Sequence, residues 1–359
     1  MEEVMNSVVR RWSTAGGAVV LAASLAACST GATGGEDEDS GSDTGVAAAE
    51  DAFPRTVEHA FGETTIEEEP ETVVAIGWIN GDILMSLDVV PAGMGEISWG
   101  TNENGSTDWI DAQLDELDAE MPTQIDEGDG INFSEIAQLE PDLIVNVIGA
   151  MSQEDYDQLS EIADVVAFDE GGENYTTGWD EATLKIGDAL GRPDDAQEVV
   201  DRVSETLAGV TEDNEVLQDK TILAGRLSPD SDSKVGIYAP NDTRPIMFEH
   251  MGFELAPVMD EIDFAPGEFS GSFSAERASE LESDLFYTWA DDQAQAEAIP
   301  EDPQLQHIPA LQNDAMIIQY DNHQANAIGT SPAALEWLVE ESGFVDELIE
   351  AAENAETAN

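Results

Sequence analysis

The sequence predicts an α/β protein with two Rossmann-like lobes, which are joined by one long helix and enclose a ligand cleft. Two series of short apolar runs support this class, one within residues 73–168 and the other within residues 221–320. In each series the apolar runs alternate with helical patterns, which is typical of parallel sheets covered by helices. One continuous helical pattern, residues 194–212, lies between the two series and is the expected link.

The chain begins with the pattern of an export signal. Arg10 and Arg11 precede an uncharged apolar run, residues 15–27, which at about 13 residues is too short to span a bilayer comfortably. The run ends in Leu25-Ala26-Ala27-Cys28, where small residues stand directly before the only cysteine. This motif resembles the bacterial lipobox, so we expect removal of residues 1–27 and lipidation of Cys28. The arginine pair leaves open whether export follows the general or the twin-arginine route.

Residues 28–52 are expected to form a tether. Gly, Ser, Thr, Ala, Asp and Glu dominate this stretch, a composition typical of solvated, disordered linkers. Order is expected from Phe53 onward. We assign the N-terminal α/β lobe to residues 53–193, the interlobe helix to residues 194–215 and the C-terminal α/β lobe to residues 216–359.

The first lobe should open with a β-hairpin, because polar and apolar residues alternate on both sides of Gly62. Compact apolar runs predict four buried strands after it, near residues 73–77, 89–94, 143–148 and 165–168. Amphipathic patterns predict helices near residues 83–87, 133–139, 153–163 and 177–190. In the second lobe, strands are expected near residues 221–224, 235–238, 285–289 and 316–320.

The interlobe helix has a strong pattern of its own. Five apolar residues recur at helical spacing, namely Val199, Val200, Val203, Leu207 and Val210. Asp194 and Asp195 lie at its N-terminus, where carboxylates interact favourably with the helix dipole. A single crossover helix should make the hinge stiff and limit closure of the lobes.

Charge restricts the environment and the partners of this protein. Its 79 Asp and Glu residues outnumber 11 Lys and Arg residues, which gives a formal net charge of −68 at pH 7. Such a charge opposes compaction at low ionic strength, but at molar salt the Debye length falls to about 3 Å and screens it. The composition therefore indicates adaptation to brine. It also excludes nucleic acid as a partner, because no basic face could neutralise phosphates.

Five segments carry a resemblance to a known family. They are Phe53–His59 with the hairpin that follows, Val73–Trp78, Asn132–Ile144, Ile186–Arg192 and Phe273–Glu276. Together, and behind a lipobox, they resemble the iron-siderophore substrate-binding lipoproteins of ABC importers, a group that also includes haem- and cobalamin-binding proteins. The resemblance implies a monomer on the outer face of the cell membrane, without an intrinsic cofactor. It would carry a ferric siderophore to a permease driven by a cytoplasmic ATPase.

Two glutamates occupy equivalent places in the two halves. Glu135 and Glu276 each follow a Phe-Ser pair near the start of an expected helix, and each precedes an aspartate, Asp142 or Asp284. The resemblance implies that these glutamates dock on arginines of the two permease copies. Their position also fits glutamates that merely stabilise a helix N-terminus.

Seven residues are expected at the ligand cleft, at or near the carboxyl ends of strands, where α/β sheets bind ligands. They are Trp78, Trp99, Arg226, Tyr238, Arg244, Trp289 and Tyr320. Aromatic faces suit a ferric chelate, and arginine can donate to its iron-bound oxygens. With only two arginines among many carboxylates, a neutral or cationic hydroxamate chelate is favoured over an anionic catecholate.

Other functions are less well supported. Haem or cobalamin could occupy the same cleft. Direct binding of zinc or manganese is disfavoured, because the four histidines show no metal-ligand spacing; they are His59, His250, His307 and His323. No nucleophile elbow or phosphate-binding loop is present, and lipidation would consume the only cysteine, so we expect no enzyme and no catalytic residue.

Overall fold

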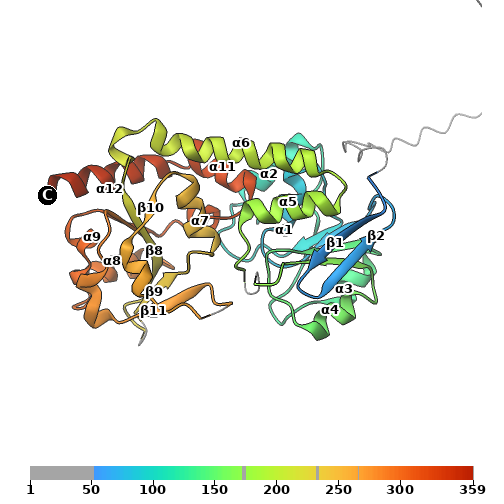
Figure 1. Ribbon diagram of the computed structural model, residues 1–359, viewed down its shortest axis with the longest axis horizontal. Coiled ribbons are helices and arrows are strands. Elements are labelled where there is room, and N and C mark those ends of the chain that lie inside the picture. Colours follow the sequence, from blue (N-terminus) through green and yellow to red (C-terminus); the bar gives the residue numbers. More distant parts are fainter. Residues whose placement is uncertain (1–51, 172–174, 232–233, 266, 359) are drawn as a thin grey trace, which may run out of the picture. The chain divides into compact units, whose positions relative to one another are not determined.

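The computed structural model describes residues 52–171, 175–231, 234–265 and 267–358. The expected signal peptide, Cys28 and the tether up to residue 51 lie outside the described residues. The described part contains two large sheets, each flanked by helices as the sequence predicted, and a separate two-stranded hairpin (Figure 1). No helix among the described residues is long and apolar enough to cross a membrane.

The first lobe combines an antiparallel hairpin with a parallel sheet. The hairpin consists of β1 (Arg55–His59) and β2 (Gly62–Ile66), and its buried residues alternate with exposed ones. The parallel sheet has the strand order β5-β4-β3-β6-β7. Its strands are β3 (Val73–Ala75), β4 (Gly93–Gly95), β5 (Thr123–Ile125), β6 (Leu143–Asn146) and β7 (Asp164–Ala167). Its helices are α1 (Asn80–Ser86), α2 (Asp108–Glu116), α3 (Phe133–Gln138), α4 (Gln153–Leu159) and α5 (Trp179–Ala189).

The sheet of the second lobe is mixed. It has the order β11-β9-β8-β12-β13, with β10 paired to β8. Its strands are β8 (Thr221–Leu227), β9 (Val235–Tyr238), β10 (Glu254–Leu255), β11 (Ser270–Phe273), β12 (Leu285–Trp289) and β13 (Met316–Gln319). The expectation of a wholly parallel sheet is wrong here, because β9 runs antiparallel to both β8 and β11. Only residues 228–234 join β8 to β9, and a parallel crossover requires about a dozen residues or more.

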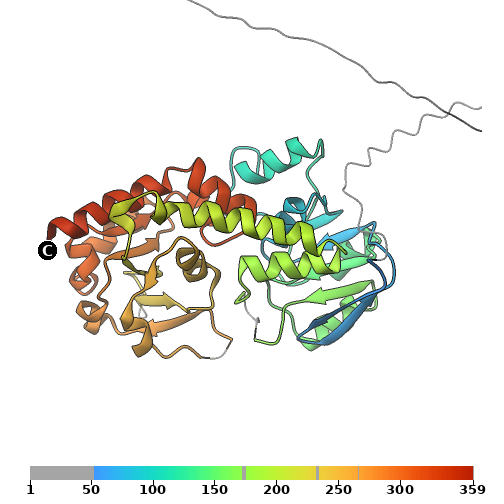
Figure 2. The ribbon, with the colours of Figure 1, turned by 45° about the horizontal axis from the view of Figure 1, so that its top comes forward.

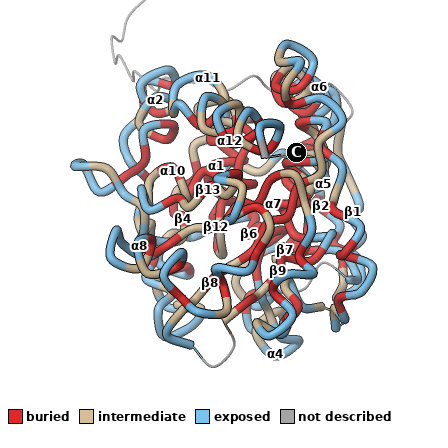
Figure 3. The backbone as a smooth tube through the Cα atoms, turned by 90° about the vertical axis from the view of Figure 1, so that its left-hand side faces the viewer, coloured by how far each residue is buried: buried red, intermediate tan, exposed pale blue. Residues whose placement is uncertain are grey.

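The helices of this half complete the fold. The α-helices are α7 (Thr243–His250), α8 (Gln293–Glu301), α9 (Pro309–Gln312), α10 (Asn322–Ala327), α11 (Pro332–Glu340) and α12 (Phe344–Ala358). Four short 3₁₀ helices are η1 (Glu215–Leu217), η2 (Pro257–Glu261), η3 (Ala275–Glu280) and η4 (Leu305–His307). Buried residues follow the strands and the inner helices, while the outward turns are exposed (Figure 3).

The long helix α6 (Pro193–Glu212) connects the last strand and helix of the first lobe to the second sheet. Pro193 stands at its first turn, where the missing N–H has no helical partner to lose. Val203 and Leu207 on its inner stripe are fully buried. In Figures 1 and 2 this yellow-green helix crosses from one sheet to the other.

A second helix also crosses between the lobes. Although α11 follows the last strand of the second sheet, it packs against α6, α1 and α2. Ala334, Leu335 and Leu338 on α11 are fully buried in this contact region. The link between the lobes is therefore wider than the single helix suggested by the sequence.

Candidate functional site

A cavity of about 650 Å³ lies between the two lobes. Trp78 and Tyr175 line it from the first lobe. The second lobe contributes Arg226, Gly236, Tyr238, Arg244, Phe269, Ser270 and Trp289. Aromatic rings and two guanidinium groups thus make up most of its wall.

The strands explain why these side chains meet. Trp78 follows the carboxyl end of β3, and Trp289 is the last residue of β12. Because β8 and β12 are parallel and Thr288 pairs with Gly225, Arg226 is placed beside Trp289. The guanidinium carbon of Arg226 lies 3.6 Å from the centre of the Trp289 ring, a cation–π contact.

Both arginines already have carboxylate partners. Arg226 Nη2 lies 2.8 Å from Asp291 Oδ2, and its Nη1 donates to the Trp289 carbonyl. Arg244 makes a bidentate pair with Asp242, with N–O distances of 2.7 and 2.6 Å. Burial opposes the charge of Arg244, but Asp242 more than offsets this effect and keeps the pKa above its ordinary value.

Aromatic contacts order the rest of the wall. Arg244 lies 3.7 Å from the centre of the Tyr238 ring, and the Tyr238 hydroxyl accepts a 2.8 Å hydrogen bond from Trp289 Nε1. Trp99, in the loop after β4, approaches Trp289 with ring centres 5.0 Å apart. Trp78 meets Tyr175 edge to face at 6.4 Å. The cavity wall is therefore a set of mutually supported rings.

A second cavity, of about 240 Å³, adjoins the first. Trp78 and Tyr175 line both cavities, and Glu127, Glu96 and Trp99 are among the other residues of the smaller one. The Glu127 carboxylate accepts the backbone N–H of Gly77, with N–O distances of 3.0 and 3.2 Å. No described Lys, Arg or His forms an ion pair with it, and burial raises its pKa.

Gly77 is required at this corner of the smaller cavity. Its φ of +75° is in the left-handed region. A Cβ there would lie 2.8 Å from Asn146 Oδ1 and 3.0 Å from the Ile148 carbonyl. Both the backbone conformation and the close approach therefore favour glycine, and they present its N–H to Glu127.

A buried carboxylate also belongs to the wall of the smaller cavity. Asp82, on α1, is only 5% exposed. Its Oδ2 accepts hydrogen bonds from Trp109 Nε1 at 2.9 Å and from the Ser331 hydroxyl at 3.2 Å. Burial raises the pKa of Asp82 to about 6. These bonds connect α1, α2 and the residue that caps α11.

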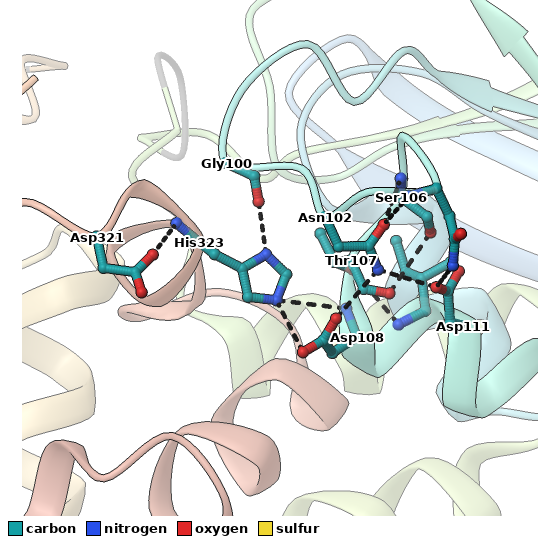
Figure 4. A network of polar contacts seen from close by, with 10 residues as sticks. Gly100, Asn102, Ser106, Thr107, Asp108, Asp111, Asp321 and His323 are labelled. Carbon is teal, nitrogen blue, oxygen red and sulfur yellow. Dashed lines mark hydrogen bonds and ion pairs between the residues drawn. The ribbon is translucent and has the colours of Figure 1, made fainter.

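The loop that carries Trp99 is fastened to α10 (Figure 4). His323 Nδ1 lies 2.7 Å from the Gly100 carbonyl and donates to it. On the other side of the ring, His323 Nε2 lies 3.5 Å from Asp108 Oδ2. Asn326 Nδ2 donates to the Trp99 carbonyl at 3.2 Å. Two residues of α10 thus hold the backbone of this loop beside the cleft.

Six of the seven residues expected at the ligand cleft line one of these two cavities. Tyr320 does not. It is 52% exposed and lines a different cavity beside β13, the edge strand of its sheet. Its position after a strand predicted a place at the cleft, but the larger cavity is lined from β8, β9, β11 and β12, and β13 lies at the opposite edge from β11.

Tyr175, Phe269 and Glu127 are among the cavity residues that were not predicted from the sequence. Phe269 directly precedes the short strand β11, and Glu127 follows β5 by two residues. Neither strand has a clear apolar pattern, so the residues next to its ends could not be recognised as cleft residues. Glu127 was also hidden by the large number of acidic residues around it.

The paired glutamates lie outside both cavities. Glu135 is half-buried in α3, and Asn132, which caps this helix, donates to its carboxylate at 2.9 Å. Glu276 is exposed and lies near the start of the short 3₁₀ helix η3. The similarity between the two halves extends to the aspartates that follow the two glutamates. Asp142 accepts the N–H of Thr72 before β3, and Asp284 accepts that of Thr221 at the start of β8.

The histidines do not converge. His59 contacts Thr64 in the hairpin, His250 lies 3.4 Å from Asp180, and His323 belongs to the α10 contact. Over the described ranges, no three His, Cys, Asp or Glu side chains are grouped so that they could hold a metal ion.

The chain is similar to several known binding proteins. A family model described as periplasmic binding protein matches residues 73–321. PiaA of Streptococcus pneumoniae, solved in complex with ferrichrome, is 27% identical with a TM-score of 0.76, covering 83% of this chain and 99% of its own. A periplasmic solute binding protein of Mycobacterium smegmatis is 25% identical, with a TM-score of 0.67 and coverage of 83% and 98%. The ferric enterobactin-binding periplasmic protein FepB of Escherichia coli is 24% identical over 305 residues, which are 82% of this chain and 90% of FepB.

Proposed function

Because the chain belongs to the periplasmic binding protein family, we propose that it is the extracytoplasmic substrate-binding component of an ABC importer and carries a ferric siderophore. The observation that carries this proposal is the cavity of about 650 Å³ between the lobes, walled by aromatic rings and two arginines. Ring faces suit the mixed polar and apolar surface of a ferric chelate, and guanidinium groups can donate to its oxygens. The iron arrives already coordinated, so it is cargo and needs no protein ligand.

The charge of the cavity favours a hydroxamate chelate. Arg226 and Arg244 are paired with Asp291 and Asp242, so the wall offers no excess positive charge to an anionic catecholate. PiaA was solved with ferrichrome, a ferric hydroxamate, whereas FepB is named for ferric enterobactin, a catecholate. The chain is similar to both proteins, so similarity alone does not choose between the two chelate classes. The pairing of both arginines with carboxylates favours the hydroxamate.

Binding should involve only a small movement of the lobes. The helix α6 spans both lobes, α11 packs across them, and α10 holds the loop that carries Trp99. Each of these contacts would have to shift for a wide opening. Small-angle scattering should therefore change little when the ligand is added.

Delivery to the permease would use Glu135 and Glu276. The aspartates that follow them, Asp142 and Asp284, make equivalent backbone contacts in the two lobes, which supports an equivalent placement of the two glutamates. Each glutamate would meet an arginine on one permease copy. In brine, exposed ion pairs are weakened, so shape complementarity should carry more of this contact.

Membrane attachment would depend on Cys28. The lipobox-like sequence before it and the tether after it support lipidation and attachment to the outer face of the cell membrane. Changing Cys28→Ser should release the protein from the membrane fraction, provided that its expression is unchanged. Retention of this variant in the membrane fraction would refute the anchor.

Fluorescence titration tests the ligand class directly. The full-length protein, purified in a mild detergent and kept in molar salt, is titrated with a ferric hydroxamate, a ferric catecholate, haem and cobalamin. We expect saturable quenching by the hydroxamate. Trp289→Phe should remove most of it, whereas Trp337→Phe, which changes an indole outside both cavities, should not. Saturation by haem or cobalamin alone would assign the cleft to those ligands instead.

A further inference from the structure

The described cations are all neutralised by the protein itself. Each of the nine described Lys and Arg residues lies within 4.0 Å of a carboxylate oxygen. This includes both arginines of the larger cavity. A negatively charged ligand would therefore meet carboxylates 2.6 to 2.8 Å from the guanidinium groups that it needs. The site is poorly matched to an anion.

Glu127 is in the opposite situation. Its only recorded partner is the N–H of Gly77, although a carboxylate has about four acceptor positions. It is half-buried, with no cation beside it in the described structure. Gly95 allows the carboxylate to approach the backbone closely, since a Cβ at that position would lie 2.6 Å from Glu127 Oε2. An unpaired carboxylate in such a place costs free energy unless a ligand supplies the partner.

The surroundings of Glu127 also suit a cation. Glu96 and Asp82 line the same cavity and add no positive charge. Trp78 and Tyr175 line both this cavity and the larger one, and aromatic faces attract ammonium groups. Its volume of about 240 Å³ suits a narrow chain and not a second chelate.

We propose that the transported ferric chelate carries a primary amine arm, and that Glu127 binds its ammonium group in the smaller cavity. The iron centre occupies the larger cavity, and the arm passes Trp78 and Tyr175 to reach the carboxylate. This inference rests on the proposed function and narrows the ligand class to cationic hydroxamates. Glu127 is then a specificity-determining residue.

A matched pair of chelates tests the inference. Ferric desferrioxamine B is a linear trihydroxamate with a terminal primary amine, and N-acetylation removes its charge without altering the iron centre. Both are titrated into the full-length protein in mild detergent and molar NaCl, by tryptophan fluorescence. The variants are Glu127→Gln, which keeps an acceptor for the Gly77 N–H, and the control Glu120→Gln, which removes an exposed charge outside both cavities.

We expect N-acetylation to weaken binding to the unaltered protein by about 10- to 100-fold, as loss of a buried charge-assisted hydrogen bond does. In Glu127→Gln, the dissociation constants of the acetylated and free-amine chelates should differ by less than about 3-fold. In Glu120→Gln, their ratio should be the same as in the unaltered protein. The unaltered protein alone is already decisive, whatever the stability of the variant. Equal affinity for the two chelates, or an unchanged ratio in Glu127→Gln, overturns the inference while the proposed function stands. Failure to bind any ferric chelate overturns both.

Discussion

Replacing Asp82 by asparagine should stabilise the folded protein at neutral pH and leave it unchanged in acid. The carboxylate is 5% exposed, and burial raises its pKa from 3.8 to about 6. Between these two values the folded state keeps a proton that the unfolded chain has released. Stability is therefore lost as pH rises through this window, and the loss is complete above the folded pKa.

The size of the effect follows from the shift. One pKa unit corresponds to about 1.4 kcal/mol, so a rise of roughly two units costs the folded protein about 3 kcal/mol at pH 8. Asparagine keeps an oxygen acceptor for Trp109 Nε1 and the Ser331 hydroxyl but carries no charge. For a body of this size, 3 kcal/mol corresponds to about 5 °C in melting temperature.

Thermal unfolding of the variant and of the unaltered protein is measured in molar salt at pH values from 4 to 8. At each pH, the quantity of interest is the difference between their melting temperatures. Taking the difference cancels the titration of the many other carboxylates, which both proteins share. We expect it to be near zero at pH 4 and to rise through pH 5 and 6 to a plateau. A difference that is flat across this range, or that falls with pH, would show that burial does not raise the pKa of Asp82 in the folded protein.

Three further results are expected. His323→Ala removes the donor to the Gly100 carbonyl and should speed ligand release several-fold by stopped-flow fluorescence, because the loop with Trp99 loses its support; an unchanged release rate would contradict this. Glu135→Gln combined with Glu276→Gln should reduce cellular uptake of the ferric chelate at least 10-fold. The affinity of the purified protein for the chelate should stay the same, and a parallel loss of affinity would argue against a docking role. Leu207→Ala on α6 should destabilise the fold by about 2–5 kcal/mol in denaturant titration, and a loss below 1 kcal/mol would mean that this helix is not a packed core element.

The fold was largely predictable because buried strands leave compact apolar runs in the sequence. The resemblance drawn from five segments and the two-lobe α/β class are both confirmed. The short strands β5 and β11 were missed, since neither has an apolar run of useful length. The antiparallel pairing of β9 was also missed, because register and direction depend on loop length more than on the strand residues themselves.

The candidate site was predictable where a strand end and a large side chain coincide. Trp78 and Trp289 were found in this way, whereas Tyr320 was placed wrongly in the cleft by the same rule, because its strand lies at the edge of the sheet opposite β11, away from the cavity. Glu127 could not be recognised, since in a chain with 79 acidic residues no single carboxylate stands out. It is recognised by its burial, by its place in a cavity and by the absence of a cationic partner among the described residues, and these are properties of the folded chain.

The crossing of α11 onto the first lobe has a consequence for biogenesis. The face formed by α1, α2 and α6 is covered by residues 332–340, more than 100 positions further along the chain. Ser331, which binds Asp82, belongs to the same late segment. During synthesis the first lobe therefore cannot complete its core until almost the whole chain has left the ribosome. Folding of the two halves is therefore interdependent, although each half has a sheet of its own.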